Sequence, residues 1–277
     1  MRETPTARVL WHIRHPLPLL KQLVLRTESH AYSAGLAFFA LVGFYPFCLL
    51  FLWVTGDVLH WAAGETVIRE TLREYYPAGQ AFLLRNLDAS VEQRGRELSV
   101  ATTLWILVGA AGIFVPLETA LNALWGVREH RPYWKNQAVG FLLTIAGVGL
   151  AFVFVLLTAA LHRAVESLDL STFAAGIASY LALKTCALVV SAAAIFLLYR
   201  FLPNRRIASR EVLPAAILAG LVAEAVRWVF LQTLPLLDLQ KDQGPYYVSV
   251  SFALLAYLEA FVLMGGAYMA ARPPETG

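Results

Sequence analysis

Four charged side chains lie inside apolar stretches of the sequence, and they are the residues best placed to do chemistry. They are Lys184, Glu224, Arg227 and Glu259, two cations and two anions whose charges sum to zero. A charged side chain at the centre of a membrane-spanning helix costs roughly 2.5–3.5 kcal/mol on insertion scales. Such groups therefore pair with one another or face a polar cavity, where they can bind an ion or a polar headgroup.

The spacing of the four charges predicts their partners. Glu224 and Arg227 are three residues apart, so a helix places them on one face within contact distance. Lys184 and Glu259 are then expected to meet across helices. Two interpretations stay open, namely a polar cavity that admits a substrate or internal ion pairs that fix the helix register. The hydroxyl groups expected beside the charges belong to Tyr180, Ser191 and Tyr257.

Six long apolar stretches are the elements that must position these side chains. Of the 277 residues, 58% are hydrophobic and 15% charged, whereas an ordinary soluble domain has about 25% charged residues. Each stretch reaches the ~20 residues that cross ~30 Å of hydrocarbon as a helix, and a backbone without water must bond within its own helix. The sequence therefore predicts an all-α, polytopic membrane protein. Its six transmembrane helices are expected at 34–56, 98–117, 138–161, 173–199, 212–235 and 246–271.

The distribution of Lys and Arg predicts the topology. Thirteen of them lie in the N-terminal segment 1–33, in the connections after the second and fourth spans, and in the tail 272–277. The alternate connections hold seven. Because strongly basic connections stay in the cytoplasm, both ends of the chain are expected there, and the long connection 57–97 is expected to be external.

Amphipathic patterns predict short helices outside the six spans. The segment 1–33 interleaves apolar side chains with Arg8, Arg14 and Lys21, and the external loop 57–97 repeats apolar positions at helical spacing. The predicted partner is the lipid bilayer, including its anionic headgroups. A net charge of +3 is ordinary for a membrane protein with basic inner loops, so no nucleic-acid partner is expected. The oligomeric state stays open, a homo-oligomer included.

Helix breakers and small residues mark bends and close approaches. Pro46 lies in the middle of the first span, where the lost hydrogen bond predicts a kink, and Pro116 is expected to end the second. Small residues on one face of the fifth span predict close helix packing and an inward position for the cation beside them. The residues on this face are Ala216, Gly220, Ala223 and Arg227.

The sequence predicts no catalytic residue, no metal site and no cofactor. Its six histidines form no HExxH-type set, and it has no Gly-rich phosphate loop and no Gly-x-Ser-x-Gly motif. Cys48 and Cys186 lie in separate predicted spans and are interpreted as packing residues.

Three motifs go beyond a generic membrane protein. They are Ser33-Ala-Gly-Leu-Ala-Phe-Phe-Ala-Leu-Val-Gly-Phe-Tyr-Pro46, Leu121-Asn-Ala-Leu-Trp-Gly-Val127 followed by Arg131-Pro-Tyr-Trp-Lys135, and Tyr199-Arg-Phe-Leu-Pro-Asn-Arg205. In order and spacing they resemble the YihY/virulence factor BrkB family of inner-membrane proteins, formerly labelled the ribonuclease BN family. The resemblance covers about residues 25–271.

The resemblance implies a multi-pass protein of the bacterial inner (plasma) membrane and an association with the envelope. It brings no settled biochemical activity, but it suggests transport of lipids or other amphiphiles. It also singles out five motif residues in the cytoplasmic connections, which are Asn122, Arg131, Trp134, Pro203 and Asn204.

Together these observations favour a non-enzymatic membrane protein that transports or accommodates a lipid or another amphiphile. The route is expected through a polar region between the fourth and sixth spans, and the substrate stays open. An alternative is a membrane scaffold that binds partners through the basic turns 125–137 and 200–211. A membrane-bound nuclease or hydrolase is the least favoured alternative, because the aqueous segments lack the acidic clusters of two-metal enzymes.

Overall fold

The regular structure of the described part of the chain is all helical. The computed structural model describes residues 4–25, 27–53, 60, 85, 112–128, 131–167, 172–237 and 247–271, and these ranges contain no strand. The predicted all-α class is therefore confirmed for them. The elements are α1 (Pro5–Arg14), α2 (Pro16–Val24), α3 (Thr27–Trp53), α7 (Phe114–Leu124), α8 (Tyr133–Glu166), α9 (Thr172–Phe201), α10 (Ser209–Thr233), the 3-10 helix η2 (Leu234–Leu237) and α12 (Tyr247–Ala271).

Four helices among the described residues are long and apolar enough to cross a membrane. They cover the predicted spans 138–161, 173–199 and 212–235 and most of the span predicted at 246–271. The candidate spans are Trp134–Val165 in α8, Gly176–Phe201 in α9, Ser209–Leu236 in α10 and η2, and Ser249–Ala271 in α12. Four of the six predicted spans thus have a matching helix, and the number six stays a prediction.

The other predicted segments are covered only in part. The first predicted span, 34–56, is helical as far as Trp53 in α3. Only residues 112–117 of the second span, 98–117, are described, and of the loop 57–97 only residues 60 and 85 are. The tail 272–277 lies outside the described residues, as do the first three residues.

Both prolines singled out in the sequence lie inside helices. The helix α3 continues through Pro46, and the kink expected there stays a prediction. Pro116, expected to end the second span, lies in the first turn of α7, which begins at Phe114, so it does not end a helix; where the second span ends stays a prediction. A proline is tolerated there because the first amides of a helix have no intrahelical acceptor.

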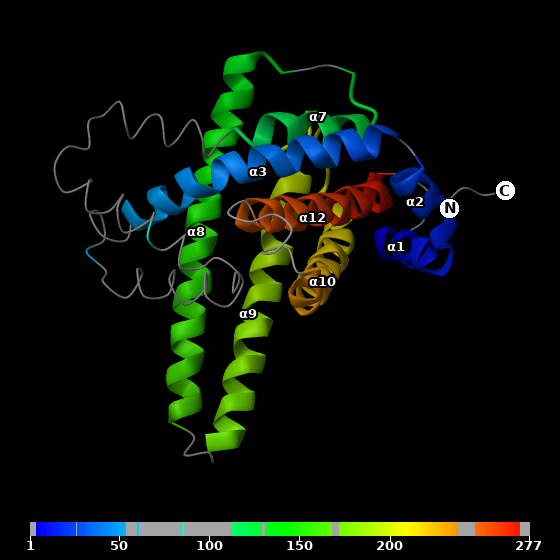
Figure 1. The fold of residues 1–277 in the computed structure, drawn as a ribbon. Coiled ribbons are helices and arrows are strands. Elements are labelled where there is room, and N and C mark those ends of the chain that lie inside the picture. Colours follow the sequence, from blue (N-terminus) through cyan, green and yellow to red (C-terminus); the bar gives the residue numbers. More distant parts are fainter. Residues whose placement is uncertain are drawn as a thin grey trace.

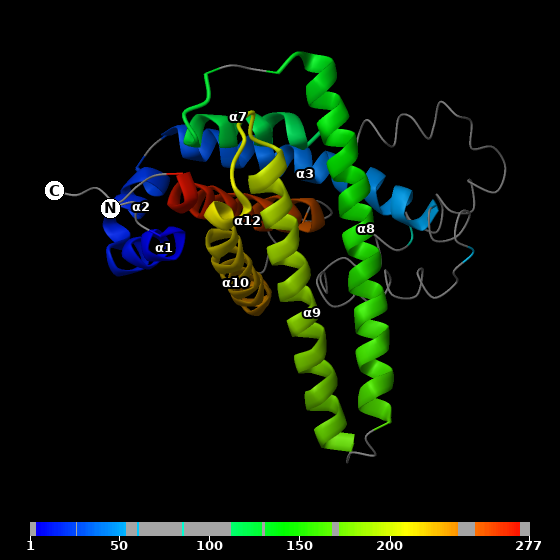
Figure 2. The ribbon, with the colours of Figure 1, turned by 180° about the vertical axis from the view of Figure 1, so that it is seen from behind.

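The helices do not form one parallel bundle. In Figure 1, the α8–α9 hairpin runs down the view while α3, α7 and α12 run across it. The helix α10 packs against both α9 and α12, and α12 packs against α3. Seen from behind in Figure 2, the end of α9 and the connection to α10 lie beside α7. The region where α9, α10 and α12 meet therefore joins the hairpin to the crossing helices.

Small residues allow this close meeting of helices. Ala216, Gly220 and Ala223 are all buried on α10, so the predicted packing face is confirmed. A methyl group added at Gly220 would lie 3.1 Å from the backbone of Ala192 on α9. Because this face holds α10 against α9, it fixes the position of Arg227 one turn further along.

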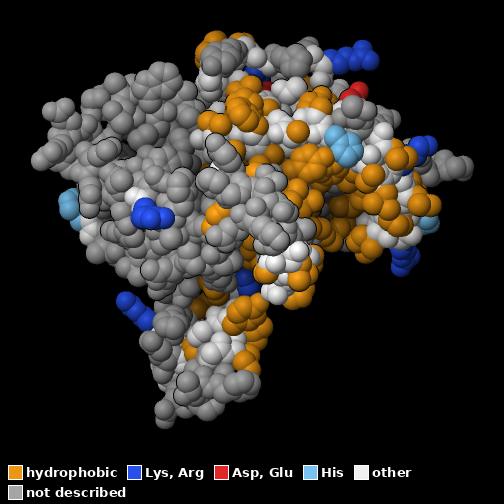
Figure 3. All heavy atoms as spheres, viewed as in Figure 1, with side chains coloured by type: hydrophobic (Ala, Val, Ile, Leu, Met, Phe, Trp, Pro, Cys, Tyr) orange, Lys and Arg blue, Asp and Glu red, His pale blue; other side chains and the backbone are white. Residues whose placement is uncertain are grey.

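The outer surface of the hairpin is apolar. Only a small part of the candidate span in α9 is buried, although the span is strongly apolar. On α8, large side chains such as Leu142 and Ile145 are exposed. Hydrophobic side chains cover most of the coloured surface in Figure 3, with few charges between them. Apolar surface on this scale is typical of contact with lipid or protein rather than water.

The N-terminal helices pack beside the end of α12. The first helix is capped by the Thr4 side chain, which accepts a hydrogen bond from the Ala7 amide at 3.3 Å. Arg8 donates through Nη1 to the carbonyl of Ala270 at 2.7 Å, where a cation complements the negative end of α12. Apolar side chains such as Leu10 and Leu17 remain exposed, as in an amphipathic helix.

Candidate functional site

Three charged side chains form one ion-pair cluster between α10 and α12. Arg227 donates through Nη1 to Glu224 Oε1 at 2.6 Å and through Nη2 to Glu259 Oε1 at 3.1 Å. Ser191 of α9 donates to the same Glu224 oxygen at 3.1 Å. The cluster therefore links α9, α10 and α12, and its three members carry a formal charge of −1.

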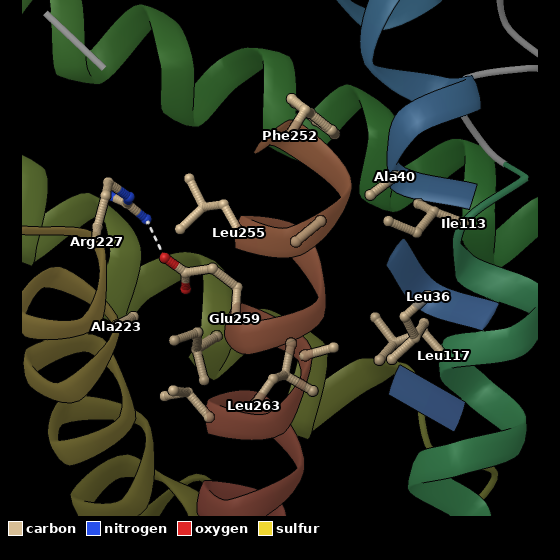
Figure 4. A pocket seen from close by; sticks show the side chains of 14 residues that line it. Leu36, Ala40, Ile113, Leu117, Ala223, Arg227, Phe252, Leu255, Glu259 and Leu263 are labelled. Carbon is tan, nitrogen blue, oxygen red and sulfur yellow. Dashed lines mark hydrogen bonds and ion pairs between the residues drawn. The ribbon is translucent and has the colours of Figure 1, made fainter. Parts of the chain in front are cut away.

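A cavity lies beside this cluster. Its volume is about 320 Å³, and Arg227 and Glu259 lie in a wall that is otherwise made of apolar side chains. Figure 4 shows the Arg227–Glu259 pair beside Leu255 and Ala223, with Leu36 and Leu117 across the cavity. The lining residues are Leu36, Ala40, Ile113, Leu117, Ile195, Ala223, Arg227, Phe252, Leu255, Ala256, Glu259, Ala260, Val262 and Leu263.

The fourth charged residue of the predicted spans, Lys184, does not make the predicted contact with Glu259. The Lys184 ammonium lies 5.6 Å from the ring centroid of Tyr180, one turn away on α9, in a cation–π arrangement. Glu259 pairs with Arg227 instead of Lys184. Lys184 precedes Ser191 by seven residues, which is about 10 Å along a helix. The predicted local contact of Glu224 with Arg227 is confirmed, and the predicted partner of Glu259 is wrong.

Tyr257 belongs to a separate contact. Its hydroxyl lies 2.6 Å from Nδ1 of His30, and Nε2 of His30 lies 2.9 Å from the carbonyl oxygen of Val24. The carbonyl can only accept, so Nε2 donates to it, and in the neutral ring Nδ1 accepts from the Tyr257 hydroxyl. This contact joins the end of α2 to the start of α3 and the middle of α12, away from the ion-pair cluster.

The geometry of the cluster allows two kinds of chemistry. The side chains of Arg227, Glu224 and Glu259 are between 16% and 25% exposed, so they are partly shielded without being sealed. In the described structure Glu259 is bonded through one oxygen, Oε1. The second oxygen of its carboxylate can accept from a cationic or hydroxyl group that enters the cavity, and the pair as a whole can exchange partners with a polar headgroup.

A second polar network joins two connections that are far apart in the sequence. Arg131 donates to the carbonyls of Phe201, Leu202 and Pro203 at 3.0–3.4 Å and to Oδ1 of Asn204 at 3.2 Å. These acceptors are the last residue of α9, Phe201, and the three residues after it, so a guanidinium closes the negative end of that helix.

The buried amide of Asn122 completes this turn network. Its Oδ1 accepts from the backbone N–H of Asn204 at 2.8 Å, and its Nδ2 donates to Glu118 at 3.3 Å. Asn122 is 1% exposed. Four of the five motif residues singled out in the sequence thus lie in one network, while Trp134 lies at its edge and is 66% exposed.

The match to a known family covers nearly the whole chain. The model of the family described as virulence factor BrkB matches residues 22–275. The chain belongs to the virulence factor BrkB family. The resemblance drawn from the sequence motifs is therefore confirmed, and this BrkB-family chain is an integral membrane protein.

Curated relatives of this BrkB-family chain are named as membrane proteins. They include the UPF0761 membrane proteins of Xanthomonas campestris pv. campestris, Xanthomonas axonopodis pv. citri and Xanthomonas oryzae pv. oryzae. Each is 25% identical over 207 residues, which are 72% of this chain and 46% of the relative. The chain thus spans about half the length of the curated relatives it matches. Their names state no enzymatic activity, and no solved structure matches the chain.

The turn network makes a testable contribution to the stability of this BrkB-family protein. Changing Arg131 to lysine keeps the charge but removes the planar fork that donates to four oxygens. Because mostly part-buried acceptors would lose charge-assisted hydrogen bonds, we expect the free energy of unfolding to fall by about 2–3 kcal/mol. Thermal unfolding in detergent measures the change. The matched control is Arg206→Lys, because Arg206 is an exposed residue of the same turn and should tolerate the change.

Several long-range contacts of this structure have no signal in the sequence that predicts the partner. His30 and Arg8 each contact a helix more than 200 residues away in the chain. Glu118 and Asn122 are one helical turn apart, so their mutual contact follows from spacing. Their link to Asn204, however, depends on where α7 meets the end of α9.

Proposed function

We propose that this BrkB-family protein accommodates and transports an amphiphile, with a lipid as the best-fitting class, through the region between α9, α10 and α12. The cavity beside the ion-pair cluster carries the proposal. Its volume of about 320 Å³ falls within the roughly 300–1,000 Å³ of small-molecule sites. An apolar wall suits a hydrocarbon chain, and a charged pair in that wall suits a polar headgroup.

Exposure of the charged pair supports a binding role over a purely structural one. Arg227 and Glu259 line the cavity and are 22% and 25% exposed. A headgroup in the cavity can therefore reach them without unfolding a helix. The cluster also keeps a formal charge of −1, which favours headgroups that bring a cationic or hydroxyl group to Glu259.

The proposal includes the setting of the protein. We infer six spans in the bacterial inner membrane with both chain ends in the cytoplasm, because thirteen Lys and Arg lie on that side against seven on the other. The proposed role is non-enzymatic, in keeping with the names of the relatives. The scaffold alternative stays a prediction, and a stable protein partner that co-purifies with the chain would favour it.

Flux of a fluorescent phospholipid across liposomes that carry the purified protein tests the proposal. Ala256→Trp places a bulky ring in the cavity, whereas Leu254→Trp places the same ring on an exposed position of the same helix. We expect the first variant to slow the flux several-fold and the second to keep it. An Ala256→Trp protein that is folded and as active as the parent would contradict the proposed route, as would the absence of flux in the parent.

Glu259→Gln is the second arm of the same experiment. It keeps the Arg227–Glu224 pair and removes one negative charge from the cavity wall, so we expect folded protein with altered flux. If instead the amount of folded protein falls while the flux per folded molecule is unchanged, Glu259 serves only to hold the helices together.

A further inference from the structure

A groove at the start of α8 lies apart from the ion-pair cluster and its cavity. Its volume is about 530 Å³, and polar and apolar residues share its wall. The lining includes Arg131, Trp134, Lys135, Ala138, Val139 and Asn204. Among the described residues that line this groove, none is acidic. We refer to it below as the α8 groove.

Cationic groups are concentrated at this groove. The Lys135 ammonium lies 5.2 Å from the ring centroid of Trp134, and Arg131 forms another part of the wall. The first turn of α8 has no acidic side chain to offset the positive end of this 34-residue helix. Exposed Arg205 and Arg206 follow Asn204 directly. The described surface around the groove therefore attracts an anion.

An apolar stripe continues from the groove along α8. The exposed positions Ala138, Leu142 and Ile145 follow Trp134 at intervals of four, four and three residues, which keeps them on one face of the helix. Leu142 is 65% exposed and Ile145 60%. The candidate span of α8 begins at Trp134 itself, and tryptophan and lysine at the end of a span are typical of the membrane interface.

We propose that the α8 groove binds the phosphate headgroup of an anionic phospholipid, with an acyl chain lying along the exposed face of α8. The cations attract the phosphate group, and the apolar stripe that continues from them along α8 contacts the acyl chain. A free phosphate ion would use the cations alone and would leave the stripe without a role. The site is independent of the cavity between α9, α10 and α12.

Retention of lipid by the purified, detergent-exchanged protein tests this proposal. The protein is incubated with phosphatidylglycerol or phosphatidylcholine of equal chain length, and the bound lipid is counted by native mass spectrometry. We expect the parent to retain phosphatidylglycerol in preference to phosphatidylcholine. Lys135→Gln should reduce that retention about five-fold, the equivalent of the ~1 kcal/mol contributed by one surface cation near anionic lipid.

Control variants distinguish binding of a phospholipid from binding of a free phosphate ion and from the general effect of removing a cation. Arg163→Gln removes an exposed cation at the opposite end of α8 and should leave the retention unchanged. Leu142→Gln interrupts the stripe and should lower the retention of phosphatidylglycerol while leaving any binding of inorganic phosphate unaffected. Thermal unfolding confirms that each variant is folded.

Three results would overturn the proposal. One is equal retention of the two lipids, or unchanged retention in Lys135→Gln. Another is complete displacement of phosphatidylglycerol by millimolar inorganic phosphate, combined with unchanged lipid retention in Leu142→Gln. These two observations together would show that the ligand is a free anion. The third is an acidic protein that co-purifies with the parent but not with Lys135→Gln when lipid is absent, which would make the groove a protein-binding surface.

Discussion

Replacing Arg227 with methionine should lower the free energy of unfolding by about 3–5 kcal/mol. The substitution keeps a long side chain but leaves Glu224 and Glu259 close together in a partly buried site with no cation between them. Two carboxylates then repel each other where water screens them poorly. The loss should exceed that of any single change elsewhere in the cluster, because Arg227 contacts both acids.

Denaturant titration in mixed micelles measures this effect. Arg163→Met is the control for removing an exposed arginine and should change stability little. The triple variant Glu224→Gln, Arg227→Met, Glu259→Gln should recover most of the loss, because it removes the unpaired charges together with the cation. A triple variant as unstable as Arg227→Met would show that packing of the arginine, and not its charge, stabilises the site.

Replacing Gly266 with alanine should also be strongly destabilising, by about 1–3 kcal/mol or more. A methyl group at this position would overlap the Tyr199 hydroxyl and would lie 2.8 Å from Cβ of Ala219. Tyr199 is fully buried and donates to the carbonyl of Leu263, so it has little room to move. The added carbon would therefore push α12 away from α9 and α10.

The neighbouring glycine is a matched control for this steric effect. Gly265→Ala meets the end of the flexible Leu23 side chain at 3.2 Å, which can shift. Alanine also favours the helix by about 1 kcal/mol over glycine, so Gly265→Ala should be nearly neutral or slightly stabilising. Gly266→Ala should lose less stability in a Tyr199→Phe, Ala219→Gly background, where the overlapping atoms are absent. Equal losses at Gly265 and Gly266 in thermal unfolding would contradict the close approach of these helices.

The four candidate spans were predictable because hydrophobic length is a local property. A stretch such as 173–199 must be a helix wherever its backbone lacks water, whatever its neighbours are. The contact of Glu224 with Arg227 was predictable for a similar reason, since three residues along a helix fix the distance between two side chains. The buried face of Ala216, Gly220 and Ala223 followed from the same period.

Contacts between helices were not predictable from these patterns. Periodicity says which residues share a face of one helix, but it does not say at what height or angle another helix crosses that face. The sequence analysis therefore expected Glu259 to pair with Lys184. The crossing of α10 and α12 instead places Glu259 against Arg227. For the same reason the hydroxyl of Tyr257, expected at the charged cluster, lies against His30.

The sequence by itself determined the membrane class, the helical content and the family. It also determined which charged residues need a polar partner inside the bilayer. Only the tertiary structure decided which charges meet, that a cavity opens beside them, and that Arg131 and Asn204, 73 residues apart in the chain, form one turn network. The physical reason is one of range. Burial and hydrogen bonding along a helix depend on neighbours in sequence, whereas ion-pair partners and cavities depend on how helices distant in sequence cross.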